Sequence, residues 1–332
     1  RVAATPRLPR GSSSGGSRRR EYDAESWTGR NVAARVTAQA APAFGGGFAR
    51  DCAVVRDLFP GAFGAVRLGV HVPSLRLVDV ETVAADVKAL RVAAKDARAA
   101  VGEAPNVCAV IGVKAEGPAA ILVSEHLDGG SLRHVCDAGG FAGHEAPLLH
   151  VAAQALAGLA AIHAACLVHG GVAPESIRVA RDGRVKLAAL GAGAAVAPRS
   201  AAYAAPDGLK TAAADVFSLG ATLYEAATGG PLAKIGEEPE LGAPYGKGVA
   251  ALVLHATRRD SSLRATAPFL LQAPCLAASK AAPWPFPHAL IVELGPFLPA
   301  DAGDELDKVA AAVAAHEAAS PQEAFLADVF GK

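Results

Sequence analysis

The first half of this chain carries short hydrophobic runs with the length and residue types of β-strands. Apolar, β-branched segments separated by turn residues lie at 66–70 (VRLGV), 75–83 (LRLVDVETV) and 119–125 (AAILVSE). The stretch 84–101, between the second and third of them, is predicted to be a helix. The pattern therefore predicts a small β-rich unit with one helix inserted.

From residue 145 the hydrophobic period becomes helical. A helix over about 146–164 is predicted because four large apolar residues share one face, namely Leu149, Leu156, Leu159 and Ile162. A second helix is predicted over 215–228 (DVFSLGATLYEAAT), ended by Gly229 and Gly230. Strands first and helices after indicate an α+β protein with two segregated lobes, here 51–127 and 128–276.

The two ends of the chain differ from this central part. Residues 1–50 are expected to form a disordered basic tail and linker, because 1–20 hold six arginines and no acid. The same Arg- and Ser-rich, acid-poor start leaves an organelle transit peptide open. We expect 277–332 to be a C-terminal extension, with a helix over 301–318 (DAGDELDKVAAAVAAHEA). Its narrow apolar stripe suits packing on the domain or on a partner, and consists of Leu306, Val309 and Val313.

Composition narrows the class of protein. The 332 residues are 52% hydrophobic, much of it alanine, so a sizeable helix-rich core held by a few larger residues is expected. Lys+Arg and Asp+Glu are both 32, so nothing in the charge calls for nucleic acid or an acidic membrane surface. We expect no membrane span, because no apolar run reaches about 20 residues.

Cysteine and methionine usage adds two expectations. The five cysteines are odd in number, widely spaced and without a CxxC pair, which indicates reduced thiols in an intracellular, cytoplasmic protein. No metal site is expected, since His163 and Cys166 have no second pair of ligands. The chain has no methionine, which suggests a fragment, a processed form or an imperfect translation.

Seven segments follow one another in an order that resembles the eukaryotic protein kinase domain, nearest the mitogen-activated protein kinase kinase group. They are FPGAFGAVRLG (59–69), VSEHLDGGSL (123–132), LVHGGVAPESIRV (167–179), VKLAALGAG (185–193), AYAAPDGL (202–209), ADVFSLGATLYEAATG (214–229) and RRDSSLRATAPFLLQAPCL (258–276). The resemblance implies a bilobal fold, with a small antiparallel β lobe and a larger, mainly helical lobe.

The resemblance also implies positions for the catalytic residues, and most of them are substituted. The strand lysine is matched by Glu81, and its helix partner by Asp86. The catalytic base is matched by Gly171, and the metal ligands by Ser176 and Ala189. Glycine and alanine supply neither a proton acceptor nor a metal ligand, so phosphoryl transfer lacks its usual charges here.

The nucleotide-binding positions that the resemblance implies are vestigial. They are Gly61, Gly64, Val66, Asp79, Ser124, Glu125, Leu127 and Arg178. Phe59 replaces the first glycine of the Gly-rich loop, so an ordinary strand turn is as good an interpretation as a phosphate cradle. Asp79 and Arg178 stand where the family sandwiches adenine, and we expect them to pair across that slot; the alternative is that both point to solvent.

The positions of the family's structural residues are better kept. The resemblance implies a stack of four side chains through both lobes, formed by Leu90, Val110, His169 and Leu190. It also implies an ion pair between Asp207 and Arg264. Asp215 is expected to hold the backbone of the catalytic loop. With Gly170 in place of an arginine, no phosphorylation switch is expected in the activation segment, whose hydroxyls are Ser200 and Tyr203.

Two functions compete. The first is a pseudokinase that acts as a scaffold or allosteric partner of other proteins, for which other kinases are one option, with no cofactor. The second is a serine/threonine or dual-specificity kinase with a non-standard site or a misread sequence, and this alternative alone calls for ATP and magnesium. The oligomeric state stays open.

Overall fold

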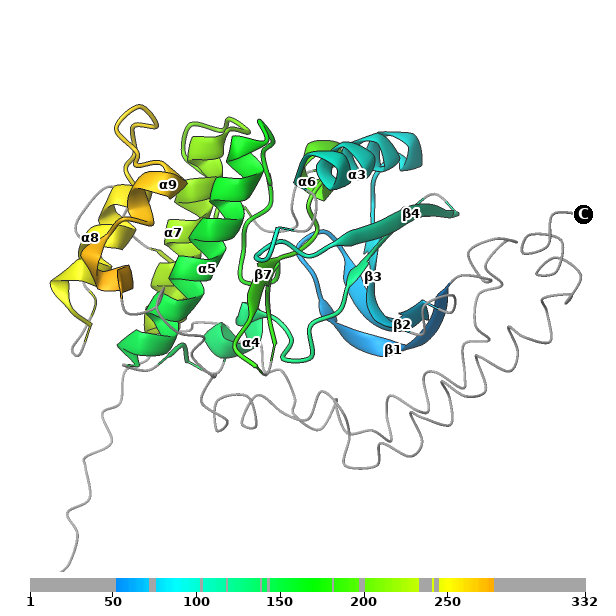
Figure 1. Ribbon diagram of the computed structural model, residues 1–332, viewed down its shortest axis with the longest axis horizontal. Helices are drawn as coiled ribbons and strands as arrows, with labels where there is room; N and C mark the ends of the chain where they lie inside the picture. Colours follow the sequence, from blue (N-terminus) through cyan, green and yellow to red (C-terminus); the bar gives the residue numbers. More distant parts are fainter. Residues whose placement is uncertain are drawn as a thin grey trace, which may run out of the picture. The chain divides into compact units, whose positions relative to one another are not determined.

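Five antiparallel strands form the first part of the domain, in the order β1-β2-β3-β5-β4 (Figure 1). The strands are β1 (Cys52–Pro60), β2 (Ala65–His71), β3 (Arg76–Val83), β4 (Val110–Glu116) and β5 (Ala119–Glu125). The computed structural model describes residues 52–71, 76–101, 104–117, 119–137, 139–141, 144–180, 182–196, 201–232, 241 and 245–277. All of them lie in one compact unit, Pro42–Lys332. The predicted tail at 1–50 and the predicted helix at 301–318 lie outside the described residues.

The register of the sheet sorts the side chains of β3 onto two faces. Val78 and Val80 pack in one cluster with Ile121 and Val123 of β5. Because successive side chains of a strand point to opposite faces, Asp79 and Glu81 face the other way. Both acids are buried all the same, with 2% and 3% of their surface exposed.

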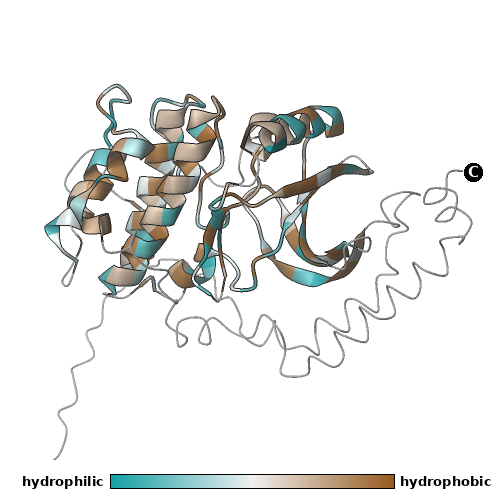
Figure 2. Ribbon diagram, in the orientation of Figure 1, coloured by the Kyte–Doolittle hydropathy of each residue, from teal (hydrophilic) through white to brown (hydrophobic). Residues whose placement is uncertain are grey.

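The helix α3 (Val87–Val101) follows β3 in the chain and packs against β4 (Figure 1). The helix begins at Val87, three residues later than predicted, because Asp86 caps it. The Asp86 Oδ1 atom accepts a hydrogen bond from Ala89 N at 2.9 Å, and Asp86 O accepts one from Leu90 N at 3.0 Å. In Figure 2, α3 carries hydrophilic stretches whereas the neighbouring β4 is largely hydrophobic.

The second lobe is mainly helical. Its elements are α4 (Leu132–Asp137), α5 (Glu145–Ala164), β6 (Ile177–Val179), β7 (Val185–Leu187), α6 (Ala192–Ala195), α7 (Ala212–Thr228), α8 (Lys247–Ala256), α9 (Ala267–Leu270) and the 3-10 turn η3 (Pro274–Leu276). The helices α5 and α7 lie side by side at its centre (Figure 1). The fold is therefore α+β and bilobal, as predicted.

The helix α7 shows how local sequence fixes both ends. It begins at Ala212 rather than 215, because Thr211 Oγ1 accepts a hydrogen bond from Ala214 N at 3.1 Å and caps it. It ends at Gly229, whose φ of +73° is readily adopted by glycine. The predicted stop is confirmed.

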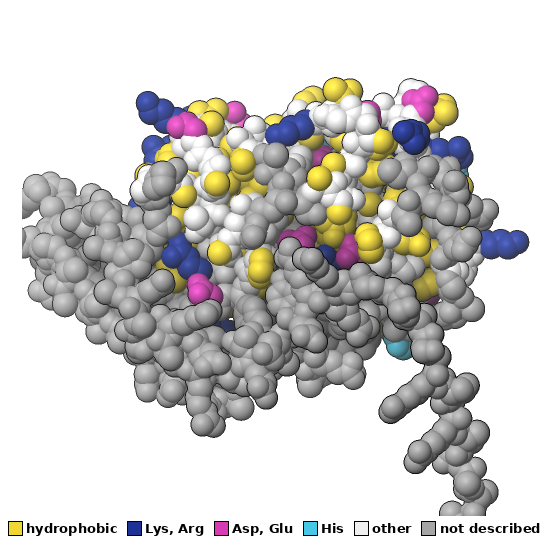
Figure 3. Space-filling view, turned by 180° about the vertical axis from the view of Figure 1, so that it is seen from behind, with side chains coloured by type: hydrophobic (Ala, Val, Ile, Leu, Met, Phe, Trp, Pro, Cys, Tyr) yellow, Lys and Arg dark blue, Asp and Glu magenta, His cyan; other side chains and the backbone are white. Residues whose placement is uncertain are grey.

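The helix α5 is long and apolar enough, by length and composition alone, to cross a membrane. Of its most apolar window, 61% is buried in the protein. A buried core helix has the same composition, so this match is weak support for a membrane span. On the face shown in Figure 3, charged side chains of both signs are scattered among hydrophobic ones over the part that is coloured.

Candidate functional site at the junction of the two lobes

A buried ion pair joins β3 to β6. Arg178 Nε lies 3.3 Å from Asp79 Oδ2, and its guanidinium also donates to Glu175 O at 2.6 Å. The Phe59 ring at the end of β1 lies against the same guanidinium, 4.4 Å from Cζ to the ring centroid. The expected pairing of Asp79 with Arg178 is confirmed, and the alternative in which both point to solvent is wrong.

The second oxygen of the same carboxylate is also engaged. Asp79 Oδ1 lies 2.7 Å from Nδ1 of His126, which directly follows β5. Arg178 is among the largest fully buried side chains of the described residues, with 1% of its surface exposed. A buried charge is tolerated only when it is paired. Breaking the Asp79–Arg178 pair would leave an uncompensated buried charge, so this interaction links the two lobes strongly.

The turn between β1 and β2 lies directly on β3. Gly61 N donates to Gly64 O at 2.6 Å, and Phe63 N donates to Glu81 Oε1 at 3.1 Å. A Cβ atom added to Gly64 would lie 1.6 Å from Thr82 O. The glycine is thus needed because the turn approaches its own sheet, which supports the strand-turn interpretation of this motif.

The Glu81 carboxyl is therefore bound to the backbone of the turn between β1 and β2, at the position where the family has its phosphate-binding lysine. Burial raises the pKa of its carboxyl, and the nearby Arg178 charge and the hydrogen bond from Phe63 offset this only in part. By accepting the hydrogen bond from Phe63 N, the carboxyl anchors the glycine-rich turn to β3.

The side chain of Phe63 fills the position next to Gly171. A Cβ atom added to Gly171 would lie 2.2 Å from Cζ of Phe63, so no larger residue fits there while the ring is in place. Phe63 is 5% exposed and packs in one cluster with Leu90, Leu122 and Ala189. An apolar ring thus occupies the space where the resemblance implies a carboxylate.

The two positions matched to metal ligands, Ser176 and Ala189, hold a hydroxyl that bonds to its own turn and a side chain without a ligand atom. Ser176 Oγ lies 3.0 Å from both Ala173 N and Ala173 O, so its hydroxyl closes its own turn. Ala189 is buried and has a φ of +61°, the left-handed region that few alanines adopt. The backbone conformation at Ala189 is strained while its side chain offers no ligand.

Asp215 holds the loop that contains His169, as expected. Its two carboxylate oxygens accept hydrogen bonds from His169 N and Gly170 N, both at 2.8 Å. His163 Nε2 lies 3.0 Å from the same Oδ2 atom. Burial lowers the pKa of His169, and the Asp215 charge opposes this only partly, so a neutral ring that donates from Nε2 to Ala188 O at 2.9 Å is favoured.

The predicted ion pair in the helical lobe is also present. Arg264 NH1 lies 3.4 Å from Asp207 Oδ2 and donates to Ala213 O at 2.8 Å. The guanidinium lies over the Phe217 ring, 5.1 Å from Cζ to the centroid. These contacts tie the segment before α7 to the turn before α9.

Asp86, the position matched to the helix partner of the strand lysine, is exposed and caps α3. Of the four residues expected to stack, Leu90 and Val110 pack in one cluster with Ala189, whereas Leu190 belongs to the core cluster of the helical lobe, which also contains Ala97 of α3. The continuous four-residue stack stays a prediction.

The other nucleotide positions lie around this junction. Val66 packs with Phe59 on the sheet. Glu125 forms an ion pair with Lys186 of β7, with Nζ–O distances of 2.7 and 2.8 Å, while Ser124 is buried. Leu127 belongs to a small cluster whose other members are Cys108, Ala180 and Ala188.

The sequence did not predict three contacts at the lobe junction. They are the Phe59 ring against Arg178, the Phe63 ring beside Gly171 and His126 against Asp79. The signal was present for the two aromatic residues, because FPGAF places a phenylalanine at each end of a tight turn. His126 could not be found from spacing, since its contact spans 47 residues.

Tyr203 is a further residue whose contacts were not foreseen. Its hydroxyl donates to Glu225 Oε2 at 2.6 Å and accepts a hydrogen bond from Arg133 NH1 at 3.1 Å. Arg133 NH2 also donates to Glu225 Oε1. The tyrosine hydroxyl is thus engaged in the core, and Ser200 lies outside the described residues.

The positions at which the family resemblance implies a magnesium nucleotide carry other groups here. Arg178 lies against Phe59 and pairs with Asp79, a Cβ atom at Gly171 would lie 2.2 Å from Cζ of Phe63, and an alanine stands at 189. Within the described residues, no group of three or more His, Cys, Asp or Glu side chains could hold a metal ion.

Comparison with known proteins identifies the family. The model of the protein kinase domain matches residues 54–265, nearly two thirds of the chain. This chain belongs to the protein kinase domain family. This chain is 39% identical over 129 residues to the serine/threonine-protein kinase PknL of Mycobacterium tuberculosis, and the aligned segment covers 34% of this chain and 32% of PknL.

Two further relatives come from other organisms. A probable serine/threonine-protein kinase of Dictyostelium discoideum is 27% identical over 139 residues, 38% of this chain and 28% of that protein. The probable serine/threonine-protein kinase pknA2 of Bifidobacterium longum is 34% identical over 123 residues, 32% of this chain and 16% of that protein. The chain thus spans about a third or less of the length of these relatives.

Proposed function

We propose that this kinase domain is a pseudokinase that acts by binding other proteins rather than by transferring phosphate. The observation that carries the proposal is the Phe63 ring over Gly171, since it supports a site in which the proton acceptor is not merely absent but replaced. The charge of opposite sign at Glu81 and the alanine at 189 support the same conclusion.

The electrostatics of the junction argue in the same direction. Phosphoryl transfer needs positive charge and metal ligands around the γ-phosphate. Here the cation that faces β3 is Arg178, and its charge is already paired with Asp79 at 3.3 Å. A nucleotide would have to break this buried pair, and removing one partner from such a pair costs about 3–5 kcal/mol.

The second candidate is an active serine/threonine kinase, and it rests on the names of the relatives. PknL, the Dictyostelium protein and pknA2 are all described as serine/threonine-protein kinases or probable ones. On this reading ATP and magnesium would bind after Phe63 and Arg178 move out of the junction.

A nucleotide titration separates the two candidates. A ligand at about 100 times its Kd stabilises the folded state by about 2.7 kcal/mol, which raises Tm by roughly 5–11 °C for a domain of this size. We expect no rise with ATP, with or without magnesium. The titration is repeated on Phe63→Ala, which removes the ring but restores no charge, to show whether the ring alone blocks binding.

A transfer assay completes the test. The purified chain is incubated with radiolabelled magnesium-ATP and a generic substrate protein, with Glu81→Ala as the background control. Phosphate incorporation by the chain that is lost in Glu81→Ala would refute the pseudokinase proposal, whereas equal counts in both support it.

Three finer statements belong to the same proposal. The partners are proteins, other kinases among them, and the compartment is the cytoplasm. Nearness to the mitogen-activated protein kinase kinase group stays a prediction drawn from the motifs.

A further inference from the structure

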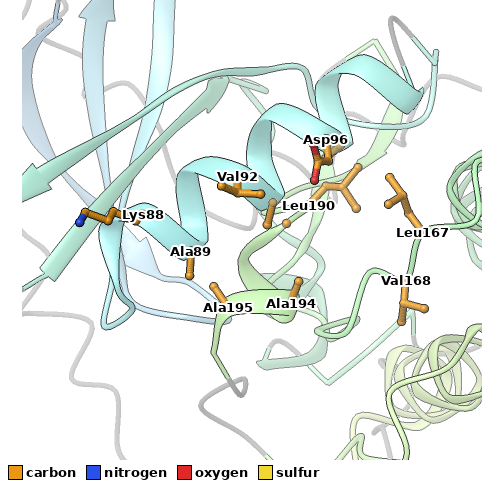
Figure 4. Close-up of a pocket in the computed structure, with 12 residues that line it drawn as sticks. Lys88, Ala89, Val92, Asp96, Leu167, Val168, Leu190, Ala194 and Ala195 are labelled. Atoms are coloured by element: carbon orange, nitrogen blue, oxygen red, sulfur yellow. The ribbon is translucent and has the colours of Figure 1, made fainter.

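The exposed side of α3 borders a pocket of about 530 Å³ whose lining is apolar except for Lys88 and Asp96 (Figure 4). Its floor comes from α6 and from the residues that precede it, Leu190 and Gly191, and its far wall from Leu167 and Val168. Figure 4 shows Ala89 and Val92 on the α3 side of the pocket, with Ala194 and Ala195 opposite. Val92 is 59% exposed at the edge of this pocket.

A row of four cations lies on α3 beside this pocket. Lys88, Arg91, Lys95 and Arg98 are all exposed and follow at intervals of three, four and three residues, so they lie on one side of the helix. No ion pair is recorded for any of the four within the residues that the structure describes. Like charges at these spacings destabilise a helix by about 0.2–0.5 kcal/mol a pair, so an acidic partner on this side would relieve a standing repulsion.

The same chain carries a segment with the complementary properties. Residues 301–318 contain five acids and one lysine, and four of the acids precede Val309. The predicted apolar stripe at Leu306, Val309 and Val313 has the i, i+3, i+7 spacing with which a helix enters an apolar groove. The acids of this segment therefore match the cations of α3 in charge, and its apolar stripe matches the pocket beside them.

The connection is long enough for the segment to reach. Roughly 24 residues separate Ala277, the last described residue, from Asp301, and an extended chain of that length spans roughly 80 Å. A tether of this kind gives an effective concentration of about millimolar, so even a weak contact is populated.

We propose that residues 301–318 bind as a helix along α3, with the apolar stripe in the pocket and the acids facing Lys88, Arg91, Lys95 and Arg98. This surface is separate from the lobe junction, so the proposal stands whether or not the domain transfers phosphate. A helix seated here covers Val92 and neutralises the cationic row.

Hydrogen exchange of the full-length chain tests the proposal. The backbone amides of 301–318 are expected to exchange at least about tenfold more slowly than in the free synthetic peptide. The protection is expected to be lost in Arg91→Glu/Lys95→Glu and retained in the matched control Lys247→Glu/Arg259→Glu, which reverses two exposed cations outside α3.

The apolar half of the contact has its own pair of variants. Val92→Asp places a charge at the pocket and is expected to remove the protection. Leu209→Asp makes the same change at a side chain that is 60% exposed outside α3, and is expected to leave the protection unchanged. Both positions are exposed, so neither variant threatens the fold.

A charge exchange identifies the contact directly. Asp304→Lys/Glu305→Lys is expected to remove the protection alone and to restore it when combined with Arg91→Glu/Lys95→Glu. Equal exchange in the full chain and in the free peptide overturns the proposal, as does protection that the α3 variants leave intact. Protection that rises with protein concentration assigns the contact to a second copy and overturns the binding within one chain.

Discussion

Removing Arg178 is expected to be among the most damaging single changes in the domain. The guanidinium is 1% exposed and lies 3.3 Å from Asp79, so at an effective dielectric constant of about 20 their attraction is about 5 kcal/mol. Arg178→Met keeps most of the volume but leaves the Asp79 carboxylate buried with His126 as its remaining partner. We expect a loss of about 3–5 kcal/mol in the free energy of unfolding.

The assay is urea unfolding followed by circular dichroism, with the loss read from the shift of the midpoint at constant slope. A thermal melt should show the same loss as roughly 6–20 °C in Tm. The matched control is Arg184→Met, because the Arg184–Asp182 pair is also short at 2.7 Å but its side chains are 59% and 56% exposed. Exposed pairs contribute about 0–1 kcal/mol, so this variant should be nearly neutral.

The double variant Asp79→Leu/Arg178→Met decides whether charge is the cause. Replacing both partners by apolar residues removes the uncompensated charge, so it should recover most of the stability that Arg178→Met loses. A loss below about 1 kcal/mol in Arg178→Met, or no recovery in the double variant, would refute the reasoning that the pair is buried and mutually dependent.

Three further predictions concern the same region. Asp215→Ala removes the acceptor of two backbone N–H groups and should cost about 3–6 kcal/mol in urea unfolding, since each hydrogen bond to a charged group contributes about 1.5–3 kcal/mol; a loss under about 1 kcal/mol would contradict the clamp. Burial raises the pKa of Glu81, so the folded state holds a proton that the unfolded state releases, and this contribution to stability falls as pH rises from the ordinary value of 4.5. The stability of Glu81→Gln relative to the parent chain should therefore increase from pH 4 to pH 8, and a difference that does not change with pH would show that the carboxyl is not buried. Phe63→Ala should cost about 3–5 kcal/mol by leaving a cavity beside Gly171, and an unchanged midpoint would place the ring in solvent.

Local sequence predicted β2, β3 and β5 from their β-branched runs, and the stop of α7 from Gly229. The strands β1 and β4 were not predicted from the hydrophobic pattern. The predicted start of α3 is three residues early because Asp86, an N-cap residue type, caps the helix.

The site was predictable where both partners belong to recognised motifs. Asp79 with Arg178, Asp207 with Arg264 and Asp215 with the His169 loop all follow from motif positions. The position of the Phe63 ring could not be deduced, because a ring at the tip of a turn can point to either side. In the structure the ring packs with Leu90, Leu122 and Ala189, and the Phe63 N–H donates to Glu81, which lies 18 residues away in the sequence.

The contact between Phe63 and Gly171 couples these two positions. A Cβ atom at 171 would lie 2.2 Å from Cζ of Phe63, so the ring has to move before any larger residue is accommodated there. Restoring an aspartate at 171 therefore requires either a shift of the ring or a smaller residue at 63, and the effects of substitutions at the two positions are expected to be non-additive.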